Sequence, residues 1–218
     1  MLECRDMSRT LISLSISLDG CIAGENESRD HPLGTHGAVL HDWMLNGDTM
    51  LTDYIDPLYQ GFFNASGVNA AVISDLFGEL GAMVFGRRTY DLVQGWGGTY
   101  PVKGIPVYVV TSDSPDAPPE GKSEIILVPS VEDAIKRARA AAGDKSVGIA
   151  GGKIGISCLL SGLVDEIYLH TVPVILGKGV RLFDPEVIDR AFLLEQKSVI
   201  EGPGVMHARY RVNNAGKV

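Results

Sequence analysis

The chain has 218 residues, of which 45% are hydrophobic and 21% are charged, a length and composition that favour one compact domain over residues 1–218 and argue against intrinsic disorder. Its formal net charge of −8 argues against nonspecific binding to nucleic acid or to an anionic membrane surface. Three widely spaced cysteines form neither a zinc motif nor a disulfide framework, so we expect a cytoplasmic protein without a metal site: Cys4, Cys21 and Cys158.

The first predicted strand covers residues 11–18, where aliphatic residues alternate with serines. This stretch is too short to span a bilayer and does not have the pattern of a signal peptide. The strand ends at Asp19-Gly20, a turn dipeptide. A long polar segment with several glycines follows, and connections of this length in compact domains are often lids or binding loops. We therefore expect a lid or insertion around residues 24–64.

Several side chains of this insertion could belong to a site or to the surface. His31, His36 and His41 lie five residues apart, a spacing that matches neither a zinc site nor one face of a helix, and we predict that they are surface residues. The aromatic residues Trp43, Phe62 and Phe63 either form the wall of a pocket for a flat heterocycle or pin the insertion to the core.

Helices and strands alternate through the middle of the chain. A predicted helix begins at Ser66 as its cap and ends at Gly81, and a second has the capping box Ser130 to Asp133. The predicted strands after the first are residues 82–85, 105–110, 125–128, 147–150 and 166–172, with later β segments at 192–200 and 205–212. This order predicts an α/β fold with a mostly parallel central sheet, helices on both faces and an antiparallel C-terminal edge.

Three strand ends carry small or hydrogen-bonding residues, and in open α/β sheets ligands bind beyond the carboxyl ends of the strands. The turn at Gly86 is followed by two arginines that suit a phosphate or are simply a solvated surface pair. A glycine pair at Gly151 lets a pyrophosphate approach bare amides or forms a plain tight turn. Hydroxyls at Thr111-Ser112 suit a ribose or phosphate or belong to a turn, and Asp113 beside them would repel a 2′-phosphate unless it turns away or pairs with an arginine.

Taken together and in order, these segments resemble the dihydrofolate-reductase-like superfamily, and within it the branch related to the reductase domain of riboflavin biosynthesis. The matching segments are SLDGCIAG at 17–24, VFGRRTY at 84–90, VVTS at 109–112, GIAGG at 148–152, VDEI at 164–167 and VPVILGKGVRLF at 172–183. They follow the order of the family from about residue 10 to residue 212, so the resemblance covers nearly all of the chain.

The resemblance implies an NADPH site and a homodimer. Backbone atoms of Ser15 and Ile22 would meet the nicotinamide amide, and a cis Gly-Gly bond is found in some members of the family. The phosphates and the ribose would be held by Gly86, Arg87, Arg88, Thr89, Thr111, Ser112, Gly151, Gly152, Lys153 and Ile154.

The proton source is less defined. Asp19 is the family match for a substrate contact and our candidate catalytic residue, although Asp-Gly after a strand is also an ordinary turn. The proline-tryptophan pair that precedes the catalytic acid of folate reductases is absent, and the nearby acids are surface residues or substitutes for it: Asp42, Asp48, Asp53 and Asp56.

We therefore expect an NADPH-dependent reductase of a small, pterin-like or pyrimidine-like heterocycle. Two alternatives remain at this point. One is the riboflavin-pathway reduction of a ribosylaminopyrimidine phosphate, and the other is a non-catalytic nucleotide-binding protein on the same fold.

Overall fold

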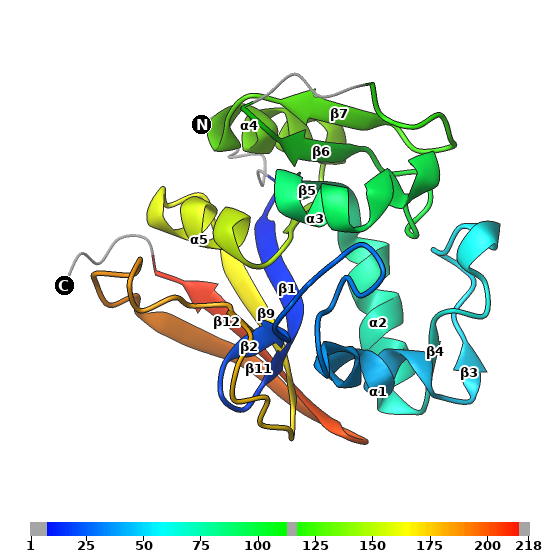
Figure 1. The fold of residues 1–218 in the computed structure, drawn as a ribbon, viewed down its shortest axis with the longest axis vertical. Helices are drawn as coiled ribbons and strands as arrows, with labels where there is room; N and C mark the ends of the chain where they lie inside the picture. The colour runs from blue at the N-terminus through cyan, green and yellow to red at the C-terminus, as the bar shows by residue number, and fades with distance from the viewer. Residues whose placement is uncertain (1–7, 113–116, 214–218) are drawn as a thin grey trace, which may run out of the picture.

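The structure is a computed structural model that describes residues 8–112 and 117–213. Its centre is an eight-stranded sheet in the order β11-β12-β9-β1-β8-β5-β6-β7 (Figure 1). The neighbours from β9 to β7 are all parallel, whereas β12 runs antiparallel to both β9 and β11. The strands are β1 (Thr10–Ser17), β5 (Leu80–Gly86), β6 (Val107–Val110), β7 (Ile125–Val128), β8 (Ser146–Ile149), β9 (Glu166–Val172), β11 (Leu194–Gly202) and β12 (Val205–Val212).

Helices cover both faces of this sheet. Because side chains alternate along a strand, Leu11 of β1 packs in one cluster with residues of α2 (Val68–Glu79). The next residue, Ile12, packs in the main core with α4 (Val131–Ala142) and α5 (Lys153–Leu160). The predicted α/β fold, with a mostly parallel sheet, helices on both faces and an antiparallel C-terminal edge, is confirmed.

The segment at 24–64 contains several short elements. These are η1 (Gly37–His41), α1 (Asp42–Leu45), β3 (Thr49–Met50), η2 (Pro57–Tyr59) and β4 (Asn64–Ala65), while β2 (Cys21–Ala23) pairs with β10 (Val180–Arg181). Buried Leu40, Trp43 and Ile55 fix the segment to the rest of the molecule. Whether it closes over a ligand stays a prediction.

Two expected boundaries of α2 are wrong. The residue before its first turn is Gly67, without a side-chain cap, and the Ser66 hydroxyl instead accepts a hydrogen bond from the Asp48 amide at 3.1 Å. The helix passes directly into β5, so Gly81 lies within a strand rather than at a helix end. A Cβ at Gly81 would lie 2.8 Å from Cα of Ala142, and the glycine therefore permits the close packing of α4.

After α3 (Arg87–Leu92) the chain forms a left-handed turn, η3 (Gln94–Gly98). Its residues have positive φ angles, including 53° at Trp96, a conformation that costs about 1–2 kcal/mol for residues other than glycine. Such strain persists only where the surrounding packing supports it. Here Trp96 packs against Phe85, Tyr90 and Tyr100.

No helix within the described residues has the length and apolar character needed to cross a membrane.

Candidate active site

The sheet opens at the carboxyl end of β1. This strand pairs with β9 from Leu11 to Ser17 but with β8 only from Thr10 to Ile12. The second half of β1 therefore faces the turn that follows β8. A Cβ built on Gly151 of this turn would lie 2.6 Å from Cδ2 of Leu14. A crevice of this kind, beyond the carboxyl ends of parallel strands, is where open α/β sheets bind ligands.

A cavity of about 340 Å³ lies at this opening, within the size range of small-molecule sites. Ser13, Ser15 and the segment 148–151 form its floor, and α2, α3 and the insertion contribute its sides. Aromatic side chains make up much of the wall: Phe63, Phe77, Phe85, Trp96 and Tyr100.

The two predicted glycine turns lie side by side. A Cβ on Gly86 would be 3.4 Å from Cβ of Ile154, the second residue of α5. Ile22 lies against the other turn, with its Cδ1 3.0 Å and 3.8 Å from the positions that a Cβ would take on Gly151 and Gly152. Gly152 has a φ of 71°, which favours glycine. The described residues contain no cis peptide bond, so the Gly151–Gly152 bond is trans here.

The predicted phosphate-binding residues are only partly assembled. Nε of Arg87 donates to both carboxylate oxygens of Asp91 at 2.7 and 2.8 Å, and its Nη1 lies 3.5 Å from Oγ1 of Thr111. Arg88 instead pairs with Glu27 of the insertion at 2.8 Å. Ser112 and Lys153 are exposed, and Asp113 lies outside the described residues.

Arg88 also borders a groove of about 540 Å³ that is lined by residues 24–27 and 177–181. Lys178 and Arg181 supply further positive charge to this groove, whereas Glu25 and Glu27 oppose it. The Arg88–Glu27 pair thus connects the insertion to α3 at the edge of the predicted cofactor site.

Asp19 makes contacts that suit an anchor for the chain. Its carboxylate accepts hydrogen bonds from the Ser17 hydroxyl at 2.6 Å and from the amides of Leu176 and Gly177 at 3.1 and 2.7 Å. These bonds lower the pKa of Asp19 to about 2, so the group is ionised at neutral pH. It does not line the described cavity, and its catalytic role stays a prediction.

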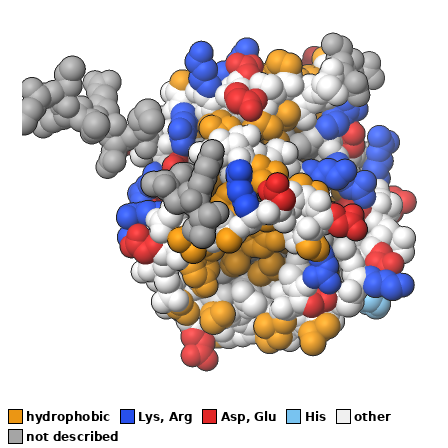
Figure 2. Space-filling view, turned by 90° about the vertical axis from the view of Figure 1, so that its left-hand side faces the viewer, with side chains coloured by type: hydrophobic (Ala, Val, Ile, Leu, Met, Phe, Trp, Pro, Cys, Tyr) orange, Lys and Arg blue, Asp and Glu red, His pale blue; other side chains and the backbone are white. Residues whose placement is uncertain are grey.

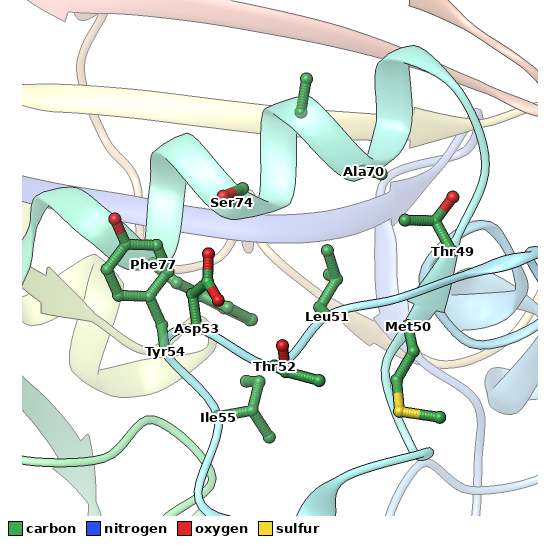
Figure 3. A pocket seen from close by; sticks show the side chains of 11 residues that line it. Thr49, Met50, Leu51, Thr52, Asp53, Tyr54, Ile55, Ala70, Ser74 and Phe77 are labelled. Atoms are coloured by element: carbon green, nitrogen blue, oxygen red, sulfur yellow. The ribbon is translucent and has the colours of Figure 1, made fainter.

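The other candidate acids also lie away from this cavity. Asp56 is buried and pairs with Lys122 at 2.9 Å, and Asp42 and Asp48 are exposed. Asp53 lines a separate cavity of about 310 Å³ between residues 49–55 and α2, in which Ser74 and Phe77 form part of the opposite wall (Figure 3).

A chain of buried polar groups adjoins the cavity and was not predicted. The Ser13 hydroxyl lies 3.1 Å from Nε2 of His170, whose Nδ1 lies 2.8 Å from Nδ1 of His207. Nε2 of His207 in turn lies 3.1 Å from Oδ1 of Asn69. Burial lowers the pKa of His170 to about 3 and that of His207 to about 4, so both imidazoles are neutral at pH 7.

Two residues of the insertion complete this cluster. Nε1 of Trp43 donates to the Ser15 hydroxyl at 2.9 Å, and its ring packs 4.9 Å from that of His170. This position fits the interpretation of Trp43 as a pin between the insertion and the core. His41, which we expected at the surface, lines the cavity instead, and its Nδ1 is buried.

Comparison with family models identifies the relationship. The model of the RibD C-terminal domain matches residues 10–207. The chain belongs to this family. Its members are reductases on a dihydrofolate-reductase-like fold, as the resemblance implied. A search of curated proteins finds no significant match.

Solved structures with the same fold are distant in sequence. A protein from Shewanella sp. PV-4 assigned to riboflavin biosynthesis has a TM-score of 0.64 and 21% identity, over 94% of this chain and 99% of that one. A pyrimidine reductase-like protein from Corynebacterium diphtheriae has a TM-score of 0.58 and 17% identity, over 94% and 92%. Dihydrofolate reductase from Enterococcus faecalis, complexed with NADP(H), has a TM-score of 0.51 and 15% identity, over 94% and 96%.

Proposed function

We propose that this protein is an NADPH-dependent reductase that transfers a hydride to a small heterocyclic substrate. The observation that carries the proposal is the aromatic-walled cavity at the opening between β1 and β8, beside the Gly151–Gly152 turn. Flat rings of a cofactor and a substrate can stack within such a space. Membership of a reductase family supports the same reaction class.

The residues at the opening fit NADPH. A side chain at Gly151 would fill the space against Leu14, so the glycine leaves backbone amides accessible to a pyrophosphate. In this proposal Ser15 and Ile22 hold the nicotinamide end, Gly86, Thr89, Gly152, Lys153 and Ile154 surround the pyrophosphate, and Arg87, Arg88, Thr111 and Ser112 hold the adenosine end. When bound, NADPH supplies the hydride.

The first experiment tests whether the protein binds NADPH, and it detects binding by thermal unfolding and by tryptophan fluorescence. The sequence has two tryptophans; Trp96 lines the cavity and Trp43 bonds to its floor residue Ser15. Both therefore report on the proposed site. We expect a higher Tm and quenched emission, and the absence of both changes would exclude the cofactor.

A pair of substitutions tests the preference for the 2′-phosphate. Arg87→Ala with Arg88→Ala is expected to weaken NADPH binding at least tenfold and to leave NADH binding within about threefold, because only NADPH carries the extra phosphate. Arg137→Ala is the control, since Arg137 also makes an i,i+4 ion pair with an aspartate, Asp133 on α4, although in the reverse order to the Arg87–Asp91 pair on α3. Equal weakening of both nucleotides would exclude this assignment of the arginines.

The family match specifically favours one alternative substrate, the ribosylaminopyrimidine phosphate of riboflavin synthesis. In that case NADPH oxidation would depend on this compound and not on pterins. A protein that binds NADPH but oxidises it with no pyrimidine, pterin or folate would instead be a nucleotide-binding protein without turnover.

We also propose a homodimer. Figure 2 shows hydrophobic side chains gathered on one face of the molecule with charged residues around them. The edge strand β11 and its neighbour β12 expose Leu194, Val199 and Met206 to 41%, 47% and 44%, and an exposed apolar sheet edge favours pairing with another chain. Light scattering of the wild type should give twice the mass of the chain, and Val199→Glu should give the monomer.

A further inference from the structure

The cavity beside the Gly151–Gly152 turn is notable for the kinds of side chain it contains. Among the described residues, its lining includes no Asp, Glu, Lys or Arg, and most of it is aliphatic or aromatic. An ion that enters an apolar cavity loses its hydration and needs a partner of opposite charge, without which the cost is several kcal/mol or more. A carboxylate or phosphate placed in this cavity would have no such partner there.

The two serines and His170 that line the cavity already have partners. The Ser13 hydroxyl contacts His170, and the Ser15 hydroxyl accepts from Trp43. His170 also contacts His207 through its other ring nitrogen. Nδ1 of His41 is buried and has no hydrogen-bond partner within the described residues. A buried polar atom without a partner costs about 1–3 kcal/mol, a cost that binding of a ligand would remove.

Burial keeps the His41 imidazole uncharged at pH 7. Burial lowers the pKa of His41 to about 4, and the Asp42 carboxylate only partly opposes this shift. The neighbouring imidazole of His170 is also neutral at pH 7, because burial, His207 and His41 all lower its pKa. A neutral imidazole presents either a donor or an acceptor at Nδ1, and both kinds of group occur on the edges of uncharged heterocycles.

We infer that this cavity takes an uncharged planar heterocycle and that Nδ1 of His41 makes the hydrogen bond that orients the ring. Any phosphate or carboxylate of the substrate would have to lie outside the cavity. The inference rests on the proposed function and deepens it, because it names the class of ring and the side chain that recognises it.

The test compares matched rings with and without a charge on NADPH-saturated protein. The probes are uracil with its 6-carboxylate, and lumazine with its 6-carboxylate, and their dissociation constants are measured by calorimetry. We expect at least one uncharged ring to bind and to bind at least ~tenfold more tightly than its carboxylate, because the carboxylate has no counter-charge in the cavity. Failure of both uncharged rings to bind, or equal or tighter binding of the carboxylates, would overturn the inference.

Variants of His41 test the recognition atom. His41→Leu is expected to weaken binding of the uncharged ring ~tenfold, the effect of one lost hydrogen bond. His41→Asn places an amide near the position of Nδ1 and should restore binding to within ~threefold of the wild type. His31→Leu is the matched control, since His31 belongs to the same insertion and is exposed. Equal affinities in His41→Leu and His31→Leu would exclude His41 as the recognition residue.

The affinity for NADPH is measured for each variant without a probe, and we expect it to stay within ~twofold of the wild type. A parallel loss of NADPH binding in His41→Leu would indicate a disturbed fold, and His41→Asn then decides whether Nδ1 is needed. If the wild type binds no NADPH, the proposed function fails. The same probes on the protein alone still decide whether the cavity selects uncharged rings.

Discussion

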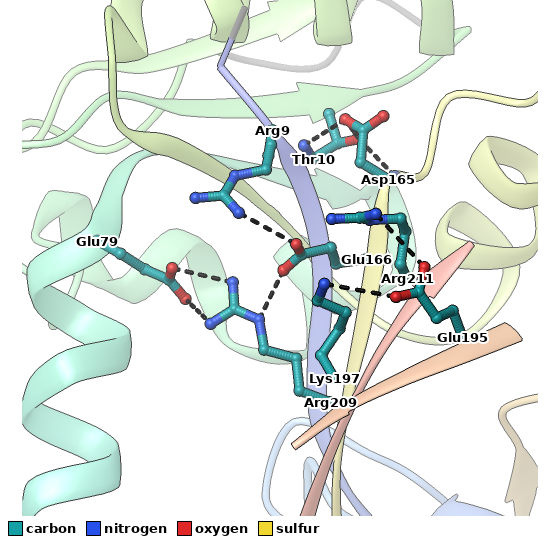
Figure 4. Close-up of polar contacts among 9 residues, drawn as sticks. All are labelled: Arg9, Thr10, Glu79, Asp165, Glu166, Glu195, Lys197, Arg209 and Arg211. Carbon is teal, nitrogen blue, oxygen red and sulfur yellow. Dashed lines mark hydrogen bonds and ion pairs between the residues drawn. The ribbon is translucent and has the colours of Figure 1, made fainter. Parts of the chain in front are cut away.

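The two ends of β1 and β9 differ in the charge of the side chains around them: the amino ends form a charged end with ion pairs around Glu166, and the carboxyl ends form a neutral end at the cavity. At their amino ends, Glu166 accepts from Arg209 at 2.6 Å and from Arg9 at 3.2 Å, and Arg209 also forms two bonds to Glu79. Figure 4 shows these ion pairs, together with the contact between Thr10 and Asp165. At their carboxyl ends, the same strands supply Ser13, Ser15 and His170 to a cavity whose described lining carries no formal charge. The first end suits stability, and the second leaves room for a ligand.

The largest expected effect comes from breaking the charged end. Arg209→Met should lower the free energy of unfolding by about 3–5 kcal/mol, because it leaves the buried carboxylate of Glu166 without its main partner. Urea denaturation measures this change. NADPH affinity should stay close to that of the wild type, since Arg209 is not among the residues that line the cavity.

Arg211→Met is the control for this prediction. Arg211 lies on the same strand and pairs with Glu195 at 3.4 Å, with both side chains about half exposed, and exposed pairs contribute only about 0–1 kcal/mol. If the two variants are equally stable, the network around Glu166 contributes no more than an ordinary surface pair.

The next largest effect is a loss of stability in acid, caused by the buried histidines at the neutral end. The folded-state pKa values of His170 and His207 lie below the unfolded value of about 6.5, so below pH 6.5 the unfolded chain binds protons that the folded protein does not. Stability should therefore fall as pH decreases from 6.5 towards 4, by about 2 kcal/mol for His170 alone between pH 6.5 and pH 5. The described groups that face the pair include His41, Trp43, Asn69 and Tyr168.

His170→Asn should flatten this dependence, because an amide does not titrate in this range. Chemical denaturation at a series of pH values gives the slope, which remains informative even if the variant is less stable overall. His31→Asn, at an exposed position, should keep the slope of the wild type. A wild-type protein whose stability does not change between pH 6.5 and pH 5 would contradict the neutral, buried state of the pair.

The predictable parts of the fold depend on local patterns. Helix α4 agrees with the sequence because its cap and its apolar stripe lie within one segment, and the Ser130 hydroxyl accepts from the Asp133 amide at 3.2 Å. The predicted helix end at Gly81 was wrong, because a glycine after a helical pattern usually marks the end of the helix. Here the requirement is distant in sequence, since the glycine makes room for Ala142.

The histidine cluster could not be found in this way. His170 and His207 meet because β9 and β12 pair antiparallel with these two residues in register, and His41 joins them from the insertion. No spacing along the chain encodes that arrangement. The strand-end glycines were accessible to prediction because each turn follows its own strand directly, whereas the side chains that fill the cavity come from separate elements.

The smallest effect tests how firmly the insertion is held at the neutral end. Trp43→Phe removes the hydrogen bond to the buried Ser15 hydroxyl but keeps most of the apolar contact, so the free energy of unfolding should fall by about 1 kcal/mol. Tyr59 of the insertion donates a longer hydrogen bond, of 3.3 Å, from its hydroxyl to the carbonyl of Trp96. Tyr59→Phe removes this bond and should lower the free energy of unfolding by less. If Trp43→Phe costs nothing, the indole does not pin the insertion through Ser15. A loss as large as that of Arg209→Met would mean that a single neutral hydrogen bond at the cavity stabilises the fold as much as the ion-pair network at the other end.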